Sequence, residues 1–304
     1  MTVLKWFESI RNPILDAFFS TVTYLGDEIC FLAICLTVLW CFSKKQGYYL
    51  LSIGGLGTLI NQYLKLIFRI PRPWVKDPSF TIVESAREAA SGYSFPSGHT
   101  QNSVGTFGAL TTMTRSVLRW ISVALCVLVP VSRLYLGVHT LLDVLVSVVI
   151  ALLLVFGLRF LFDRLGDDEK KLYWFFCGLT AFALSFLLFV ELFPFPHDID
   201  PSNLASGRKN AYTFMGVLVG LLVSYPIEVK HVRFDTKAVW YMQILKVLVG
   251  LLIILGIKEG LKPVLTALIG THPVTVSIRY GLMVVFALAV YPLTFRWFSK
   301  LGKK

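Results

Sequence analysis

Lys65-Leu-Ile-Phe-Arg-Ile-Pro-Arg-Pro73 is the first of three polar islands in otherwise very apolar sequence. The second is Tyr93-Ser-Phe-Pro-Ser-Gly-His99, and the third is Ser132-Arg133 followed by His139 and Asp143. Together they supply fixed cations, a glycine-containing turn, two histidines and a carboxylate. Ionisable groups inside apolar sequence cost free energy and usually mark a functional site. The islands are therefore candidates for a site that binds and transfers a phosphoryl group.

The composition around these islands is that of a membrane protein. Of the 304 residues 56% are hydrophobic and only 15% are charged, with a mean hydropathy of +0.70, whereas soluble domains carry about 25% charged residues. Long apolar segments predict an all-α polytopic membrane protein. We expect nine transmembrane helices, over 28–43, 47–69, 97–114, 118–137, 139–162, 172–193, 211–227, 239–261 and 275–298. The third and eighth are the weakest, because they contain or adjoin polar residues.

The segment before the first predicted span differs from the rest. Residues 1–27 mix charged residues with apolar residues at helical spacing, and Asn12-Pro13 is a typical helix start. This pattern predicts an interfacial helix lying on the membrane surface. We therefore divide the chain into this helix, a core over 28–165 that carries the three islands, and additional transmembrane helices over 166–304.

The net charge of +11 comes mostly from Lys and Arg at the ends of apolar segments. This distribution favours a membrane-topology signal and contact with anionic lipids, and it argues against a nucleic-acid partner. Nine crossings and the bias in positive charge place the C-terminus in the cytoplasm. All three islands then lie on the extracytoplasmic face, and we expect the plasma membrane as the location.

Cysteines and carboxylates give no sign of a metal centre. The five cysteines, Cys30, Cys35, Cys41, Cys126 and Cys177, lie in or beside apolar segments without metal-ligand spacing. We find no carboxylate cluster suited to Mg²⁺. We therefore expect neither a metal nor another cofactor.

The first two islands offer groups that bind phosphate. Lys65 and Arg72 are seven residues apart and share one face if the helix persists, with Pro71 ending it. Arg72 would present a planar fork and Lys65 a point charge. In the second island, Ser97 and Gly98 at a helix N-terminus would present N–H groups to an anion. Each island alone has an ordinary structural interpretation, as snorkelling cations or as a capped turn.

The third island supplies a nucleophile. His139 and Asp143 are at i and i+4 and would project from one face of a helix. Asp143 could then accept a proton from one imidazole nitrogen and leave the other free to attack. His99, in the first turn of its helix, could protonate a leaving oxygen. A purely structural His–Asp pair is the alternative.

In this order, Lys-x6-Arg-Pro, Pro-Ser-Gly-His and Ser-Arg-x5-His-x3-Asp resemble the three-part signature of the type-2 phosphatidic acid phosphatase superfamily, which includes glucose-6-phosphatase and the vanadium haloperoxidases. The resemblance implies that His139 forms a phosphohistidine, that Asp143 orients it, and that His99 is the acid and base. It also implies that the phosphoryl oxygens are held by Lys65, Arg72, Ser97, Gly98 and Arg133.

The resemblance leaves the substrate open. We expect an integral-membrane hydrolase of a lipid phosphate or diphosphate, with membrane lipids as its partners. The alternatives are a phosphatase for a soluble ester such as a sugar phosphate, and a transporter or binding protein that grips a phosphate headgroup without cleaving it. The added C-terminal helices could widen the substrate groove or form a homodimer surface.

Overall fold

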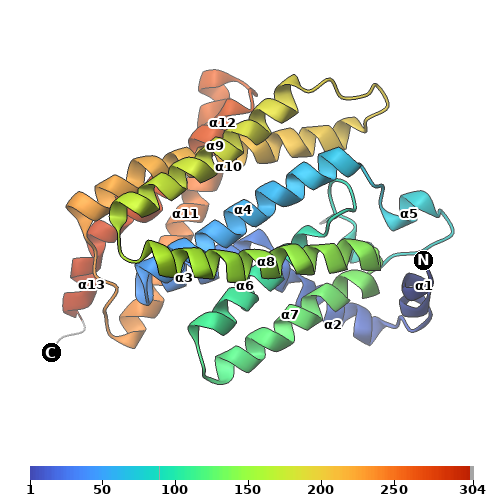
Figure 1. Ribbon diagram of the computed structural model, residues 1–304, viewed down its shortest axis with the longest axis horizontal. Helices are drawn as coiled ribbons and strands as arrows, with labels where there is room; N and C mark the ends of the chain where they lie inside the picture. The colour runs from blue at the N-terminus through green and yellow to red at the C-terminus, as the bar shows by residue number, and fades with distance from the viewer. Residues whose placement is uncertain (89, 302–304) are drawn as a thin grey trace. The chain divides into compact units, whose positions relative to one another are not determined.

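The computed structural model describes residues 1–88 and 90–301, and every regular element in this part of the chain is helical (Figure 1). The α-helices are α1 (Thr2–Ser9), α2 (Pro13–Thr23), α3 (Glu28–Cys41), α4 (Lys44–Phe68), α5 (Pro73–Lys76), α6 (Gly98–Met113), α7 (Val117–Tyr135), α8 (Leu141–Leu165), α9 (Glu169–Leu192), α10 (Pro201–Ile227), α11 (Trp240–Ile269), α12 (Val274–Val285) and α13 (Phe295–Leu301). Shorter 3-10 or π-helical turns cover Tyr24–Gly26, Glu84–Ala86, Glu228–Val232, Phe286–Val290 and Tyr291–Thr294.

The chain forms two compact units. The first comprises Met1–Ile34, Tyr49–Asp163 and Ile199–Ser206, and the second comprises Cys35–Tyr48, Arg164–Asp198 and Gly207–Lys304. All three polar islands belong to the first unit. The site can therefore be described within that unit alone.

Six described stretches are long and apolar enough to cross a membrane, and a seventh crossing is possible if Pro13–Gly26 and Glu28–Cys41, bent by 49°, form one span. These six are Val117–Tyr135, Leu141–Leu165, Glu169–Leu192, Pro201–Val232, Trp240–Ile269 and Val274–Leu301. Each of the nine predicted spans falls on helix, but the number nine is not confirmed. The predicted spans over α4 and α6 are not among the six, because polar residues such as Asn61, Gln62 and Lys65 interrupt the apolar sequence of α4 and because α6 has only 16 residues, many of them polar.

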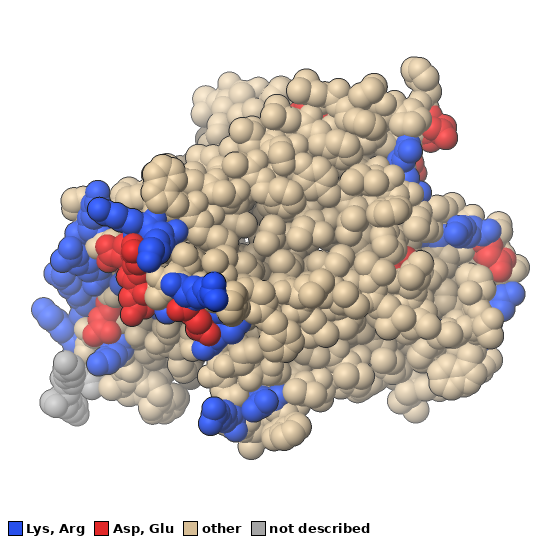
Figure 2. Space-filling view, viewed as in Figure 1, with Lys and Arg blue, Asp and Glu red and all other residues tan. Residues whose placement is uncertain are grey.

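Figure 2 shows wide areas of surface that carry few Lys, Arg, Asp or Glu side chains, while the charged side chains gather in separate clusters. Exposed Leu, Val, Ile and Phe are numerous on α8 and α11. Such a surface is costly in water and suits a lipid environment.

The N-terminal segment is not the single interfacial helix that we expected. Asn12 caps a new helix, because its Oδ1 accepts hydrogen bonds from the backbone N–H of Ile14 (3.1 Å) and Leu15 (3.0 Å), as the Asn12-Pro13 pattern predicts. Pro13 at the first helical position has no N–H to continue the preceding helix. The helix α1 therefore ends at Ser9 and α2 begins at Pro13.

These two helices pack on the corner of the first unit that carries the islands. Leu4 lies in a buried cluster with Phe80, Ile82, Leu134 and Val144. The loop after α5 is tied to the corner between α7 and α8, because the Val83 N–H donates to the Leu136 carbonyl (3.2 Å). The N-terminal segment and this loop thus form the rim of the candidate site.

Two helix boundaries differ from expectation. The helix α4 ends at Phe68 rather than at Pro71, since Arg69 has φ of 49°, and Arg72 is the N-cap of α5. Lys65 and Arg72 therefore do not share a face of one helix. Similarly, α8 begins at Leu141, so His139 precedes it by two residues instead of lying on its face with Asp143.

Candidate active site

The second island forms the N-terminus of α6. Ser97 is its N-cap, with a side chain that accepts from the Thr100 N–H (3.4 Å), and His99 lies in the first turn as predicted. A Cβ at Gly98 would have Asn61 Oδ1 as its nearest neighbour, at 3.9 Å. The side chain of Asn61 on α4 thus lies close to this helix start. Both of its polar atoms are buried without a hydrogen-bond partner among the described residues.

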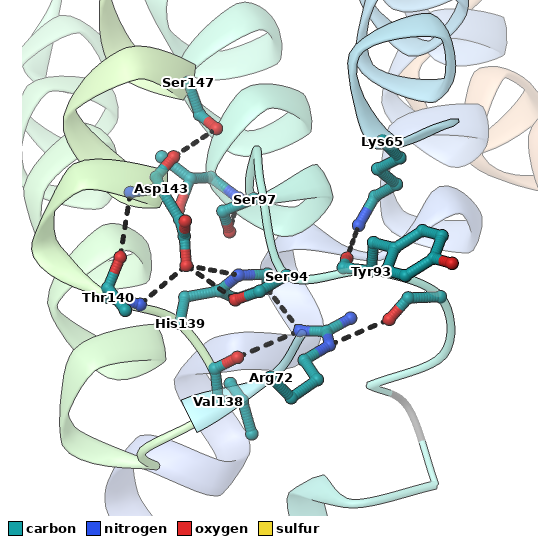
Figure 3. Close-up of polar contacts among 12 residues, drawn as sticks. Lys65, Arg72, Tyr93, Ser94, Ser97, Val138, His139, Thr140, Asp143 and Ser147 are labelled. Atoms are coloured by element: carbon teal, nitrogen blue, oxygen red, sulfur yellow. Dashed lines mark hydrogen bonds and ion pairs between the residues drawn. The ribbon is translucent and has the colours of Figure 1, made fainter. Parts of the chain in front are cut away.

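His139 is fully enclosed, with 2% of its side chain exposed. Its Nε2 lies 2.9 Å from Arg72 Nη1 (Figure 3). Arginine can only donate, so Nε2 is the acceptor in this contact and holds a lone pair. The proton of the neutral imidazole is therefore on Nδ1, which faces Asp143 Oδ2 at 3.7 Å.

The distance of 3.7 Å is too long for the hydrogen bond expected between His139 and Asp143. The carboxylate of Asp143 instead accepts from Ser94 Oγ (2.6 Å) and the Thr140 N–H (2.7 Å). The Asp143 N–H in turn lies 3.3 Å from Thr140 Oγ1. This reciprocal pair is a capping box at the start of α8. Asp143 is thereby fixed in place next to the imidazole.

Lys65 and Arg72 are both buried, and here they hold the chain at the start of the second island and just before it. The Lys65 ammonium donates to the Tyr93 carbonyl. Arg72 donates to the carbonyls of Gly92 (3.0 Å) and Ser91 (2.7 Å) and, across the site, to that of Val138 (2.9 Å). Burial lowers the pKa of Arg72 to about 10, and Asp143 acts in the opposite direction, so the guanidinium is charged at neutral pH.

Arg133 is the most enclosed cation of the set, with no exposed surface. Its Nη1 donates to Thr23 Oγ1 on α2 (2.6 Å). Its Nε and Nη2 have no hydrogen-bond partner within the described part of the chain. An arginine held by one nitrogen, with the N–H donors of its other two nitrogens left over, is suited to binding an anion.

His99 makes a contact that the sequence did not predict. Its Nε2 lies 2.7 Å from Asp27 Oδ1, in the turn between α2 and α3. A small pocket opens here, lined by Asp27, His99 and Arg133 together with Ser20, Thr23, Tyr24, Ser85 and Ala86. The N-terminal segment therefore supplies one wall of the site.

The predicted site residues thus converge, although they come from three islands that are separate in the sequence. Lys65, Arg72, Arg133 and His99 all lie close enough to act electrostatically on His139. Ser97 is joined to Asp143 through its N–H and the Asp143 carbonyl (3.3 Å). Within residues 1–88 and 90–301, no three His, Cys, Asp or Glu side chains lie close enough together to hold a metal ion.

Sequence reasoning missed Asp27, Ser94 and Asn61. Ser94 adjoins the second island and could have been considered as a hydroxyl donor. Asn61 is one helical turn before Lys65 in α4, so it was accessible to a helical-face argument. Asp27 carried no such signal, because it is 72 positions before His99 and outside every motif.

Comparison with known proteins supports the family resemblance. Residues 46–167 match the family described as the PAP2 superfamily, and residues 212–304 match its phosphatase transmembrane extension. The undecaprenyl-diphosphatase BcrC of Bacillus subtilis is 31% identical over 163 residues, which cover 52% of this chain and 79% of BcrC. A probable sphingosine-1-phosphate phosphatase of Dictyostelium discoideum is 28% identical over 189 residues, covering 55% of this chain but only 44% of the relative.

Among solved structures, the crystal structure of the first transmembrane PAP2 type phosphatidylglycerolphosphate phosphatase from Bacillus subtilis is 25% identical. It has a TM-score of 0.47 and covers 55% of this chain and 85% of that one. The match to BcrC spans most of that enzyme, and the two family matches together include all three islands and much of the C-terminal half. The chain therefore belongs to the PAP2 superfamily and is one of its multi-pass membrane phosphatases.

Proposed function

We propose that this chain hydrolyses a phosphate monoester or diphosphate of a membrane lipid, with His139 as the nucleophile. The observation that carries the proposal is the contact between Arg72 Nη1 and His139 Nε2 at 2.9 Å, inside a ring of buried cations. This contact indicates that Nε2 of His139 holds a lone pair, close to the buried cations Lys65, Arg72 and Arg133. The relatives that act on undecaprenyl diphosphate and sphingosine 1-phosphate, by their names, support a lipid substrate.

The first step forms a phosphohistidine. The Nε2 lone pair of His139 attacks phosphorus while the bond from phosphorus to the ester oxygen breaks. The positive charge that develops on the imidazole is stabilised by Asp143, whose carboxylate faces Nδ1. His99 gives a proton to the departing oxygen, so a monoester releases a neutral alcohol and a diphosphate releases the lipid monophosphate.

The second step releases phosphate. His99, now neutral, takes a proton from water as the water oxygen bonds to phosphorus and the phosphorus–nitrogen bond breaks. Throughout, the equatorial oxygens carry negative charge that fixed donors can stabilise without a metal. We assign this role to Arg133, Arg72, Lys65 and the N–H groups around Ser97 and Gly98.

We also propose the membrane orientation and the domain boundaries that the sequence predicts. The phosphatase core would occupy 28–165, with the site on the extracytoplasmic face of the plasma membrane, and 166–304 would add membrane helices. The match of residues 212–304 to the transmembrane extension supports the last part.

The test is phosphate release by purified protein in detergent, with EDTA present, from a panel of lipid phosphates, lipid diphosphates and sugar phosphates. We expect turnover of at least one lipid and trapping of acid-labile, base-stable phosphoprotein, both lost in His139→Ala. Turnover that survives His139→Ala would refute the nucleophile. Binding without turnover would favour a phosphate-binding or transport protein, and preference for the sugar phosphates would favour a soluble substrate.

A further inference from the structure

The turn that contains Asp27 is built against His99. A Cβ added to Gly26 would lie 2.9 Å from the His99 carbonyl oxygen and 3.1 Å from the His99 Cβ, so only glycine allows this approach without displacement. Asn102, one turn further along α6, donates from Nδ2 to the carbonyls of Gly26 (2.8 Å) and Asp27 (3.1 Å). The backbone of Asp27 is therefore clamped to the helix that carries His99.

This clamp directs a carboxylate at one particular nitrogen. Asp27 Oδ1 is 2.7 Å from His99 Nε2, and a carboxylate is an acceptor, so the Nε2 position carries the proton. The two ring nitrogens then have different roles. Nδ1 remains as the nitrogen that can give and take a proton.

We propose that Asp27 is the positioning residue for His99. The two residues form a second His–carboxylate pair, in which Asp27 orients the acid that protonates the leaving group, just as Asp143 orients the nucleophile His139. The inference rests on the proposed function. Asp27 holds Nε2–H and stabilises the imidazolium. The proton on Nδ1 then passes to the ester oxygen as its bond to phosphorus breaks, and Nδ1 recovers a proton from the attacking water.

The surroundings of His99 make such a partner necessary. His99 is largely enclosed, with 17% of its side chain exposed, and Arg133 lines the same pocket. Both burial and a neighbouring guanidinium disfavour the imidazolium form. Asp27 opposes this effect at close range. Without a carboxylate at this place, the acid would be protonated less often when the ester is bound.

The experiment uses the dependence on the leaving group. Alkyl phosphates need the alkoxide protonated, whereas p-nitrophenyl phosphate releases a stable anion that needs no acid. We expect Asp27→Asn to reduce kcat for dodecyl phosphate by about 10²-fold, within the range for general acid catalysis, and kcat for p-nitrophenyl phosphate by less than about threefold. His99→Ala should show the same selectivity, more strongly. The exposed neighbour Glu28 provides the matched control, and Glu28→Gln should change neither rate.

Inhibition by vanadate, measured on the same preparations, reports whether the anion site is intact. A second variant, Asn102→Ala, releases the Gly26–Asp27 turn without touching Asp27, and should give a weaker loss that again falls mainly on dodecyl phosphate. Equal losses on both substrates, or none, in Asp27→Asn with intact vanadate binding would overturn the role of Asp27. If Asp27→Asn no longer binds vanadate, the test passes to Asn102→Ala, and equal losses of kcat on the two substrates in that variant would overturn the role of Asp27. Turnover in His139→Ala would instead overturn the proposed function.

Discussion

At the scale of single residues, Arg133 is an example of a side chain whose burial lowers stability but suits phosphate binding. It is completely buried, yet two of its guanidinium nitrogens have no partner in the described chain. Unpaired buried donors cost free energy. This cost is understandable if those donors are reserved for phosphoryl oxygens, and it makes Arg133 different from Lys65 and Arg72, whose donors hold backbone carbonyls.

We therefore predict that Arg133→Met lowers kcat by about 10²–10³-fold, the usual effect of losing a donor to transition-state charge. The same variant should leave the thermal midpoint in detergent unchanged or raised, because a buried unpaired charge has gone. Arg119→Ala, at an exposed position of the same helix, is the control and should keep full activity. A large drop in the midpoint of Arg133→Met would mean that the arginine serves the fold instead.

At the scale of elements, the end of α1 and the turn that follows it clamp the loop after α5. Glu8 accepts from the N–H of Thr81 (2.9 Å) and from its hydroxyl (2.5 Å), and Arg11 donates to the Thr81 carbonyl (2.8 Å) and the Tyr135 carbonyl (3.1 Å). The hydroxyl of Thr81 is the main cause that lowers the pKa of Glu8. The contact therefore contributes above the normal pKa of glutamate and is lost as pH falls through the lowered value.

From this clamp we predict that Arg11→Ala speeds amide hydrogen exchange in the loop over 77–88, measured by mass spectrometry at neutral pH, by about tenfold. One lost hydrogen bond of about 1.4 kcal/mol corresponds to that factor. Exchange in α9, which belongs to the second unit, should not change. Unaltered exchange in 77–88 would show that the apolar cluster of Leu4, Phe80 and Ile82 holds the loop by itself.

The second unit contains a buried ion pair that is testable on its own. Lys44 Nζ lies 2.5 Å from Glu228 Oε1, and Glu228 is only 2% exposed. Lys44→Met should destabilise the protein, because Glu228 stays buried without its cation. The cost should fall below the about 3–5 kcal/mol of a fully buried pair, since Lys44 is 31% exposed. The double variant Lys44→Met/Glu228→Gln should regain most of the free energy of unfolding that Lys44→Met loses. If the losses of the two single variants simply add in the double variant, the two side chains are not coupled.

The elements also show what a sequence can and cannot predict here. Apolar runs predicted helices at nine places and the structure has helix at each, because periodicity and length are local properties. The Asn12 cap and the start of α6 were predicted for the same reason. Lys65 and Arg72 do not share a helical face because the backbone at Arg69 has a positive φ that ends α4, and no sequence pattern predicts this conformation. Asp27 beside His99 is a long-range contact between unrelated segments, and single-sequence reasoning has no access to such pairs.

At the scale of the whole molecule, the decisive question is which side of the membrane the site faces. The helix α6 starts at the site and runs for 16 residues, about 24 Å, before the turn that carries Arg115. Lys76, the last residue of α5, precedes the rim loop and is exposed, as is Arg115. Positive charge near the far ends of the predicted spans favours a cytoplasmic location for the turn with Arg115.

We predict that, in a variant whose five cysteines are replaced, a membrane-impermeant maleimide labels Lys76→Cys in intact cells and labels Arg115→Cys only after the membrane is opened. The reason is that Lys76 belongs to the segment leading into the site at the start of α6, whereas Arg115 follows the other end of α6, and this helix is as long as most of a bilayer core. Both variants must label in detergent, which controls for reactivity. Labelling of Arg115→Cys alone in intact cells would reverse the orientation and place phosphate release in the cytoplasm. Labelling of both variants in intact cells would mean that the two ends of α6 do not lie in different compartments. The polar residues along α6 would then line a water-accessible path and not the interior of a closed helical bundle.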